Sequence, residues 1–323
     1  MKKTLAKLAS TVLFGSLCLG ASAQSVKVDA GLPEYTPVSG VTGNLNSIGS
    51  DTLNNLMTLW AEEFKKFYPN VNIGIEGKGS STAPPALIEG TAQLGPMSRE
   101  MKSSEIDKFE AKYGYKPTEI KVAIDALAVF VHKDNPIASL DLKQVDGIFS
   151  STYKRGGQSL ENWGQAGLTG TWATLPMSLY GRNSASGTYG FFKEHTLSKG
   201  DYKTTVKEQP GSSAVVQGIA SELSGIGYSG IGYKTSGVKA LAISDKAGPV
   251  DATQANAESF KYPISRYLYV YINSNPSTGP DPLVKEFIRF VMSKQGQQVV
   301  IKDGYFPLPS KKAAEFLESS GAQ

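Results

Sequence analysis

The segment VAIDALAVFV, residues 122–131, is apolar at every position except Asp125. A run of this kind is typical of a strand that is buried on both faces of a parallel sheet. A second strand is predicted from YPISRYLYVYIN, residues 262–273, because β-branched and aromatic side chains favour strands. From Asn44 onward, strand-like segments alternate with helix-like segments. This alternation predicts an α/β fold.

The clearest helical pattern lies upstream of these strands. Its apolar residues recur at spacings typical of one helix face: Leu53, Leu56, Met57, Trp60, Phe64 and Phe67. This helix is expected to end near Tyr68, and a strand is predicted over residues 71–75. Pro84 and Pro85 predict the start of another helix, since proline is tolerated in a first turn. A further helix is predicted over residues 281–293.

The first 23 residues have the pattern of a signal peptide. A basic segment precedes an apolar one, and Ala21-Ser22-Ala23 is a small-x-small cleavage site. The apolar segment, residues 8–19, is shorter than the roughly 20 residues that span a bilayer. The predicted product is therefore exported. Cys18, the only cysteine, permits a second interpretation as a lipid-modified lipoprotein cysteine.

The composition indicates a folded protein with a nearly neutral surface. Hydrophobic residues make up 40% of the 323 residues, which is enough to build cores, and the length predicts about two domains. Without the three lysines of the leader, the formal net charge falls from +4 to +1. This argues against a nucleic-acid partner. With two distant histidines and no cysteine beyond the leader, we expect no metal and no cofactor.

Three short segments share glycine and hydroxyl side chains, and each precedes a predicted helix. They are GSDT (residues 49–52), GSST (79–82) and SASGT (184–188). One such segment is usually a helix cap. Helix N-termini also present free N–H groups and partial positive charge to anions. Three segments in one chain, together with Arg182, favour an oxyanion site.

Asp125 interrupts the apolar strand, and two interpretations stay open. A buried carboxylate must be paired, hydrogen-bonded or exposed to a wet cleft. Asp125 is therefore either a structural residue bonded to backbone N–H groups or part of a functional site.

The sequence shows no catalytic constellation. Ser186 has no G-x-S-x-G context and no histidine base close in sequence, so we expect no nucleophile. The G-x-G-x-x-G match at residues 225–230 precedes a strand-like segment and not a helix, which argues against a dinucleotide site. The chain is not expected to be an enzyme.

The segments named above, with GPMSR (95–99), GRNSASGT (181–188) and GQQVVIKDGYFPLP (296–309), resemble the periplasmic phosphate-binding proteins of Pst ABC transporters. The resemblance covers most of residues 44–309. It implies a type II periplasmic binding protein with two α/β lobes, hinge strands and a cleft that holds inorganic phosphate. It also implies a monomer that delivers phosphate to membrane permease subunits. Lobe I is expected over residues 44–127 plus 262–323, lobe II over 128–261, and an N-terminal extension over 24–43.

The residues expected to bind the ligand come from the three loops, from Asp125 and from matches to the family. They are Ser50, Asp51, Thr52, Ser80, Ser81, Ser98, Asp125, Arg182, Ser186, Gly187 and Thr188. Two positions depart from the family pattern. Ser98 stands where the family has an aspartate that accepts the phosphate proton, and Ser184 stands where an aspartate braces the arginine. We expect Asp51 to be the substitute acceptor, with Asp125 second. The alternative is that Asp51 only caps the helix that ends at Tyr68.

Two other functions remain open from the sequence. One is a secreted phosphatase-like enzyme, because some secreted phosphatases resemble this family. The other is an adhesive or surface role for the N-terminal extension.

Overall fold

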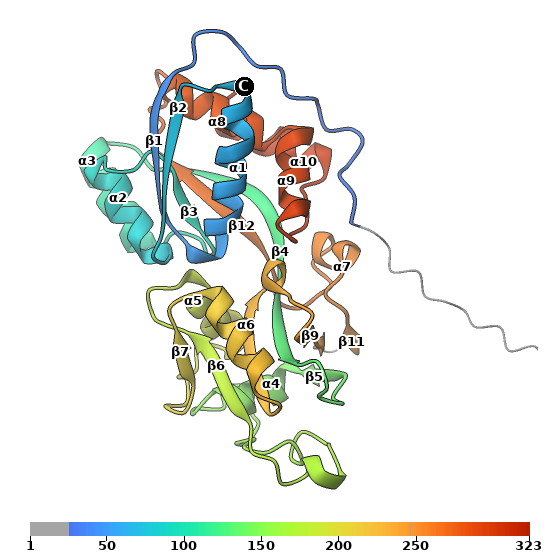
Figure 1. The fold of residues 1–323 in the computed structure, drawn as a ribbon. Helices are drawn as coiled ribbons and strands as arrows, with labels where there is room; N and C mark the ends of the chain where they lie inside the picture. The colour runs from blue at the N-terminus through green and yellow to red at the C-terminus, as the bar shows by residue number, and fades with distance from the viewer. Residues whose placement is uncertain (1–25, 246) are drawn as a thin grey trace, which may run out of the picture.

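The computed structural model describes residues 26–245 and 247–323 and shows two lobes joined by long strands (Figure 1). The predicted signal peptide and Cys18 lie outside the described residues. The mixed α/β fold predicted from the alternating segments is confirmed. Within the described residues, no helix is both long and apolar enough to cross a membrane.

Lobe I, at the top of Figure 1, contains both the first and the last elements of the described chain. Its strands are β1 (Gly43–Gly49), β2 (Val71–Gly77) and β3 (Gly95–Met97). Its helices are α1 (Asn54–Phe67), α2 (Ala83–Glu89), α3 (Ser103–Tyr113), α8 (Pro282–Val291), α9 (Lys294–Lys302) and α10 (Ser310–Ser319). These elements confirm the helix predicted to end near Tyr68, the strand after it and the proline-opened helix.

The predicted apolar face of α1 is the core face of lobe I. Trp60 and Phe64 are fully buried, and Phe64 packs against Phe287 and Phe290 of α8. The indole N–H of Trp60 donates to the carbonyl of Gly296 at 2.8 Å. The helix spacing in the sequence therefore locates the face of α1 that contacts α8 and α9.

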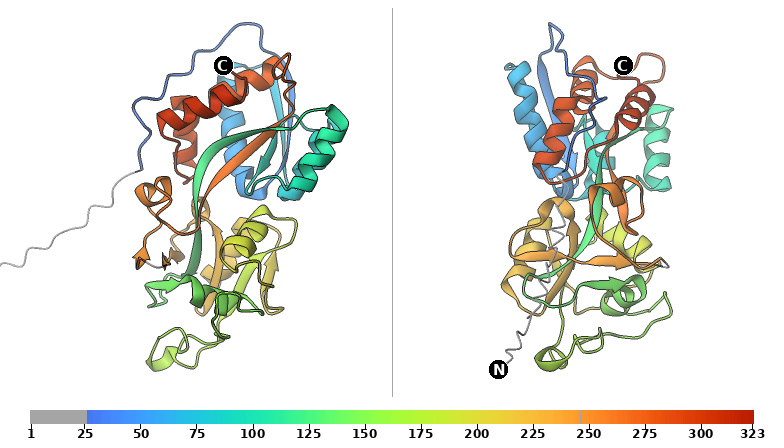
Figure 2. Two further views of the ribbon diagram at one scale, coloured as in Figure 1. Left: turned by 180° about the vertical axis from the view of Figure 1, so that it is seen from behind. Right: turned by 90° about the vertical axis from the view of Figure 1, so that its right-hand side faces the viewer.

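Two long strands run between the lobes: β4 (Thr118–His132) and β12 (Ser265–Ile272). The prediction that the apolar run lies in a parallel sheet is wrong, since β4 is antiparallel to β12, β8 and β9. The run is apolar because helices from both lobes, α6, α7 and α10, pack on it. Burial on both faces produces such a run whatever the strand direction. Figure 2 shows both strands crossing the waist of the molecule.

Lobe II, at the bottom of Figure 1, is formed mainly by the part of the chain that lies between β4 and β12 in the sequence. Its strands are β5 (Ser139–Asp141), β6 (Ser178–Arg182), β7 (Lys207–Gln209), β8 (Gly225–Gly230), β9 (Val238–Ala240), β10 (Ala242–Ser244) and β11 (Pro249–Val250). Its helices are α4 (Leu142–Phe149), α5 (Gly187–His195) and α6 (Ser212–Ser221), and α7 (Gln254–Glu258) lies beside the connecting strands. Strand β6 is parallel to β7 and β8. Parallel pairing thus occurs in this lobe, where the sequence alternates strand and helix.

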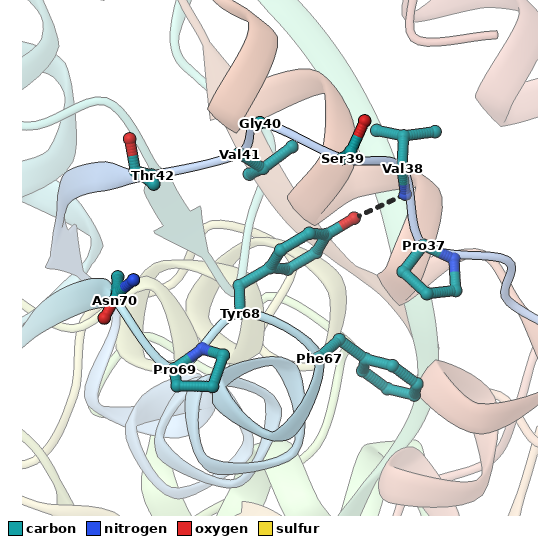
Figure 3. A pocket seen from close by; sticks show the side chains of 10 residues that line it. All are labelled: Pro37, Val38, Ser39, Gly40, Val41, Thr42, Phe67, Tyr68, Pro69 and Asn70. Carbon is teal, nitrogen blue, oxygen red and sulfur yellow. Dashed lines mark hydrogen bonds between the residues drawn. The ribbon is translucent and has the colours of Figure 1, made fainter.

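Residues 26–42 form an arm that runs over lobe I before β1 (Figure 1). The hydroxyl of Tyr35 lies 2.7 Å from that of Tyr68 and donates to Glu286 at 3.0 Å. The N–H of Val38 donates to the Tyr68 hydroxyl at 3.0 Å, beside a shallow pocket between the arm and the end of α1 (Figure 3). The arm is therefore held against α1 and α8 by specific contacts, on the side of lobe I away from the loops described next.

Candidate functional site

The three glycine- and hydroxyl-rich loops meet at the junction of the lobes. Two follow strands of lobe I and lead into the short 3-10 turns Asp51–Leu53 and Ser80–Thr82. The third follows β6 of lobe II and leads into α5, which faces lobe I in Figure 1. Loops at the carboxyl ends of strands are the usual position of ligand sites in α/β proteins. The segment GPMSR, residues 95–99, contains β3 and places Ser98 beside these three loops. The junction therefore brings four of the predicted segments together.

A cluster of buried hydroxyls occupies the centre of this junction. Ser98 Oγ lies 3.0 Å from Ser50 Oγ and 3.3 Å from Ser80 Oγ. It also accepts from Thr188 Oγ1 at 3.3 Å, and Thr188 Oγ1 lies 2.9 Å from Thr52 Oγ1. All five residues are at most 2% exposed. Hydroxyls both donate and accept, so the cluster offers convergent donors to an anion.

Helix α5 begins against this cluster. Ser186 caps it, accepting from the N–H groups of Thr188 and Tyr189 at 3.1 and 3.3 Å. A Cβ atom on Gly187 would lie 2.2 Å from Ser80 Oγ and 2.7 Å from Ser98 Oγ. Glycine is required here because the two lobes approach each other more closely than a side chain allows. Ser81 lies at the rim, where its N–H and hydroxyl both donate to the carbonyl of Ala185.

Arg182 ends β6 and is 1% exposed. Its Nη1 donates to Ser212 Oγ at 2.7 Å and its Nη2 to the carbonyl of Pro210 at 3.1 Å. Its Nε is buried without a hydrogen-bond partner among the described residues. Burial lowers the pKa of Arg182, and the charge of Asp51 opposes this effect. A buried guanidinium with an unused donor is suited to an oxyanion.

Asp51 reaches across the junction to lobe II. Its Oδ2 lies 3.3 Å from Arg182 Nη1 and accepts from the N–H of Ser212, the first residue of α6, at 2.8 Å. The alternative that Asp51 caps its own helix is wrong, because Ser50 Oγ accepts from the N–H of Thr52. Asp51 thus supplies the brace for the arginine that Ser184 does not. No hydrogen bond to its Oδ1 is found within the described part of the chain.

Asp125 is fully engaged in structural contacts. Its Oδ1 accepts from the N–H of Ile231 at 2.9 Å, and its Oδ2 accepts from Arg266 Nε at 2.9 Å. The bond to a backbone N–H agrees with the structural interpretation, and a role of Asp125 in the site stays a prediction.

Two residues of this junction, Arg266 and Ser212, were not predicted from the sequence. Arg266 is the charged residue within the apolar strand β12, a signal equal to that of Asp125 in β4. Ser212 belongs to Gly211-Ser212-Ser213 at the start of α6, a segment with the same composition as the three loops. Both signals were present in the sequence.

The remaining candidates lie outside the junction. Residues 225–230 form β8, which confirms that the glycine pattern is not a helix-opening loop. His132 Nδ1 accepts from the N–H of Asp134, and His195 packs against Phe191 with tilted rings whose centroids are 4.2 Å apart. Among the described residues, no group of three or more potential ligands could hold a metal ion.

One carboxyl near the site titrates around neutral pH. Burial raises the pKa of Asp303 to about 7, while a hydrogen bond from Asn55 lowers it. The folded chain therefore retains a proton that the unfolded chain loses from about pH 4 upward, and the free energy of unfolding falls as the pH rises through this window to about 7.

Asp303→Asn should remove this loss. Relative to the parent, we expect its free energy of unfolding to rise by about 2–3 kcal/mol between pH 5 and pH 8. Denaturant unfolding at both pH values measures the change, and Asp107→Asn, at an exposed position of α3, is the control. A parallel pH dependence in Asp303→Asn and the parent would contradict the assignment.

Two α/β lobes, two connecting strands and an anion-type site between the lobes define a type II periplasmic binding protein. A sequence model of the PBP superfamily domain matches residues 36–295. The phosphate-binding protein PstS of Pseudomonas aeruginosa is 56% identical over 320 residues, which cover 98% of this chain and 99% of that protein. The chain belongs to the PstS family of phosphate-binding proteins, which confirms the resemblance seen in the sequence.

Solved structures show the same fold. A putative phosphate ABC transporter substrate-binding protein from Clostridium perfringens, solved with bound phosphate, has a TM-score of 0.70 and 26% identity, covering 82% of this chain and all of that one. A possible phosphate-binding protein from Planctomyces limnophilus has a TM-score of 0.62 and 27% identity, covering 87% and 98%.

Proposed function

We propose that this chain captures inorganic phosphate in the periplasm and delivers it to the permease subunits of an ABC transporter. The observation that carries this proposal is the convergence of five buried hydroxyls with α5 and Arg182 between the lobes. The relatives named as phosphate-binding proteins support the same ligand.

The geometry suits a dehydrated tetrahedral oxyanion. Hydroxyls from lobe I and lobe II donate from opposite sides, and the N-terminus of α5 adds partial positive charge. Arg182 adds charge-assisted donors, which are about twice as strong as neutral ones. Hydrogen bonds from many fixed protein donors replace the hydrogen bonds to water that the anion loses when it is buried.

Delivery requires that the receptor act together with a permease. Delivery is tested by complementation of a bacterial strain that lacks its own phosphate receptor but keeps the permease. Restored uptake of radiolabelled phosphate supports the proposal. A chain that binds phosphate without restoring uptake would limit the function to binding.

A phosphatase of the same fold is the alternative, and no contact in the site favours it. The buried serines of the cluster bond to one another and to threonines, with no histidine among their hydrogen-bond partners in the described residues. Release of phosphate from a monoester, assayed with metal supplied, tests the alternative directly. Catalytic release of phosphate from the monoester would show that the chain is an enzyme and would contradict the proposed receptor function.

The lobe limits, residues 44–127 plus 262–323 and 128–261, are part of this proposal. They are supported by β4, whose partner changes from β12 at Ala126 to β8 at Leu127. The monomeric state is likewise proposed, since a receptor whose two lobes enclose the ligand needs no second copy.

Phosphate should stabilise a closed form, because its donors come from both lobes. We expect a smaller radius of gyration in small-angle scattering when phosphate is added to stripped protein. We also expect a higher melting temperature through binding linkage. Identical scattering curves with and without phosphate would contradict closure.

Asp51 is the carboxylate proposed to favour phosphate over sulfate. Its Oδ1 is available to accept the proton that phosphate carries and sulfate lacks, whereas both oxygens of Asp125 are engaged. Asp51→Asn should keep the fold but lose most of the preference for phosphate. Competition of sulfate against radiolabelled phosphate measures it, and a variant that rejects sulfate as the parent does would exclude Asp51 as the acceptor.

A further inference from the structure

Arg266 is a buried cation that the family resemblance does not account for. It is 2% exposed, and the register of β12 on β4 places it opposite Asp125. Its Nη2 lies 2.7 Å from Asp125 Oδ2. Arg266 makes two further hydrogen bonds to residues other than Asp125. Its Nη1 donates to the carbonyl of Ser98 at 2.7 Å, and its Nη2 donates to Thr188 Oγ1 at 3.0 Å. One guanidinium therefore holds groups from both lobes.

The bond to Thr188 fixes the direction of its hydroxyl. A hydroxyl has one proton and two lone pairs. Because Thr188 Oγ1 accepts from the guanidinium, its own proton points elsewhere, into the cluster, where Thr52 Oγ1 lies 2.9 Å and Ser98 Oγ 3.3 Å away. Hydrogen bonds in a chain polarise one another, so a hydroxyl that accepts from a cation is a stronger donor.

Arg266 also adds charge beside Arg182. Burial is the main cause that lowers the pKa of Arg182, and the charge of Arg266 lowers it further. Each guanidinium has one carboxylate partner, Asp51 for Arg182 and Asp125 for Arg266. The electrostatic potential at an anion in the cleft therefore depends on how far the negative charge of each carboxylate neutralises the positive charge of its arginine.

We propose that Arg266 is the second cation of the anion site. It polarises the Thr188 hydroxyl towards phosphate and draws Ser98 and Thr188, from opposite lobes, onto one guanidinium, while Asp125 limits the charge that the anion meets. This inference rests on the proposed phosphate function and specifies how the same cleft binds its ligand. Arg266 is a positioning residue, since it acts through Thr188.

Two substitutions in the pair separate this role from a structural one. Arg266→Gln and Asp125→Asn break the same ion pair, so a merely structural pair predicts weaker phosphate binding in both variants. The proposed role predicts opposite signs. Arg266→Gln should weaken phosphate binding by at least tenfold, whereas Asp125→Asn should strengthen it severalfold because the negative charge is removed. The gain should be larger at pH 8, where phosphate is mainly a dianion, than at pH 6.

The measurement is calorimetry of the phosphate-stripped chain with inorganic phosphate at both pH values. Arg99→Gln is the matched control, because Arg99 lines the same pocket as Arg266 but is paired with Glu105 at 2.8 Å. Its affinity should equal that of the parent. Arg266→Lys, which keeps the charge but not the planar fork, should recover part of the loss.

Each outcome decides the inference. Parental affinity in folded Arg266→Gln overturns it, and so does equal or weaker binding in Asp125→Asn. If Arg266→Gln fails to fold, Asp125→Asn alone decides through the sign of its effect. Failure of the parent itself to bind phosphate would instead remove the proposed function, so the two failures are distinguishable.

Discussion

Arg182→Ala is expected to weaken phosphate binding by tenfold to a hundredfold or more. Charged hydrogen bonds contribute about 1.5–3 kcal/mol each, and about 1.4 kcal/mol corresponds to a factor of ten. The substitution removes a guanidinium that is 1% exposed and leaves the hydroxyl donors in place. It also leaves Asp51 without its cation, which places an uncompensated negative charge beside the anion. Titration calorimetry with phosphate measures the change.

Arg155→Ala is the matched control for this prediction. Arg155 is another arginine of lobe II, and its guanidinium donates to the carbonyls of His195 and Thr196, at the far end of α5 from the hydroxyl cluster. We expect its phosphate affinity to stay at the parental value. Unchanged affinity in Arg182→Ala would remove Arg182 from the site.

Gly187→Ala is expected to reduce phosphate affinity by a similar factor without unfolding the chain. Its Cβ would lie 2.2 Å from Ser80 Oγ, so the lobes cannot close with both hydroxyls in place. Forced overpacking of this kind costs about 1–3 kcal/mol. The cost arises only where the lobes meet, so the melting temperature of ligand-free protein should change little.

Gly190→Ala tests whether the effect comes from the contact or from the helix. Gly190 lies one turn along α5, where the nearest atom to an added Cβ is 3.6 Å away. Both substitutions change helix propensity in the same direction. Equal affinity in the two variants would show that Gly187 does not limit closure.

The parts of the fold that follow from local patterns could be predicted from the sequence. The spacing of Trp60 and Phe64 placed α1 and its buried face, because helix periodicity is a local property. The glycine and hydroxyl loops were predicted before helices for the same reason. The direction of β4 could not be predicted, because burial on both faces produces the same apolar run in parallel and antiparallel pairs.

The contacts between distant segments required the fold. Asp125 and Arg266 are 141 positions apart, and only the register of β4 on β12 makes them a pair. Asp51 and Ser212 are separated by 161 positions and meet across the two lobes. The chemical type of each of these residues is evident from the sequence, whereas its partner depends on the arrangement of the two lobes.

Calorimetry of phosphate-stripped, refolded protein with phosphate and with sulfate measures whether the junction of the lobes is a phosphate site. We expect one saturable site for phosphate, with sulfate bound much more weakly, because a carboxylate near the anion favours the ligand that still carries a proton. Absence of phosphate binding by the folded chain, or equal affinity for sulfate, would contradict it.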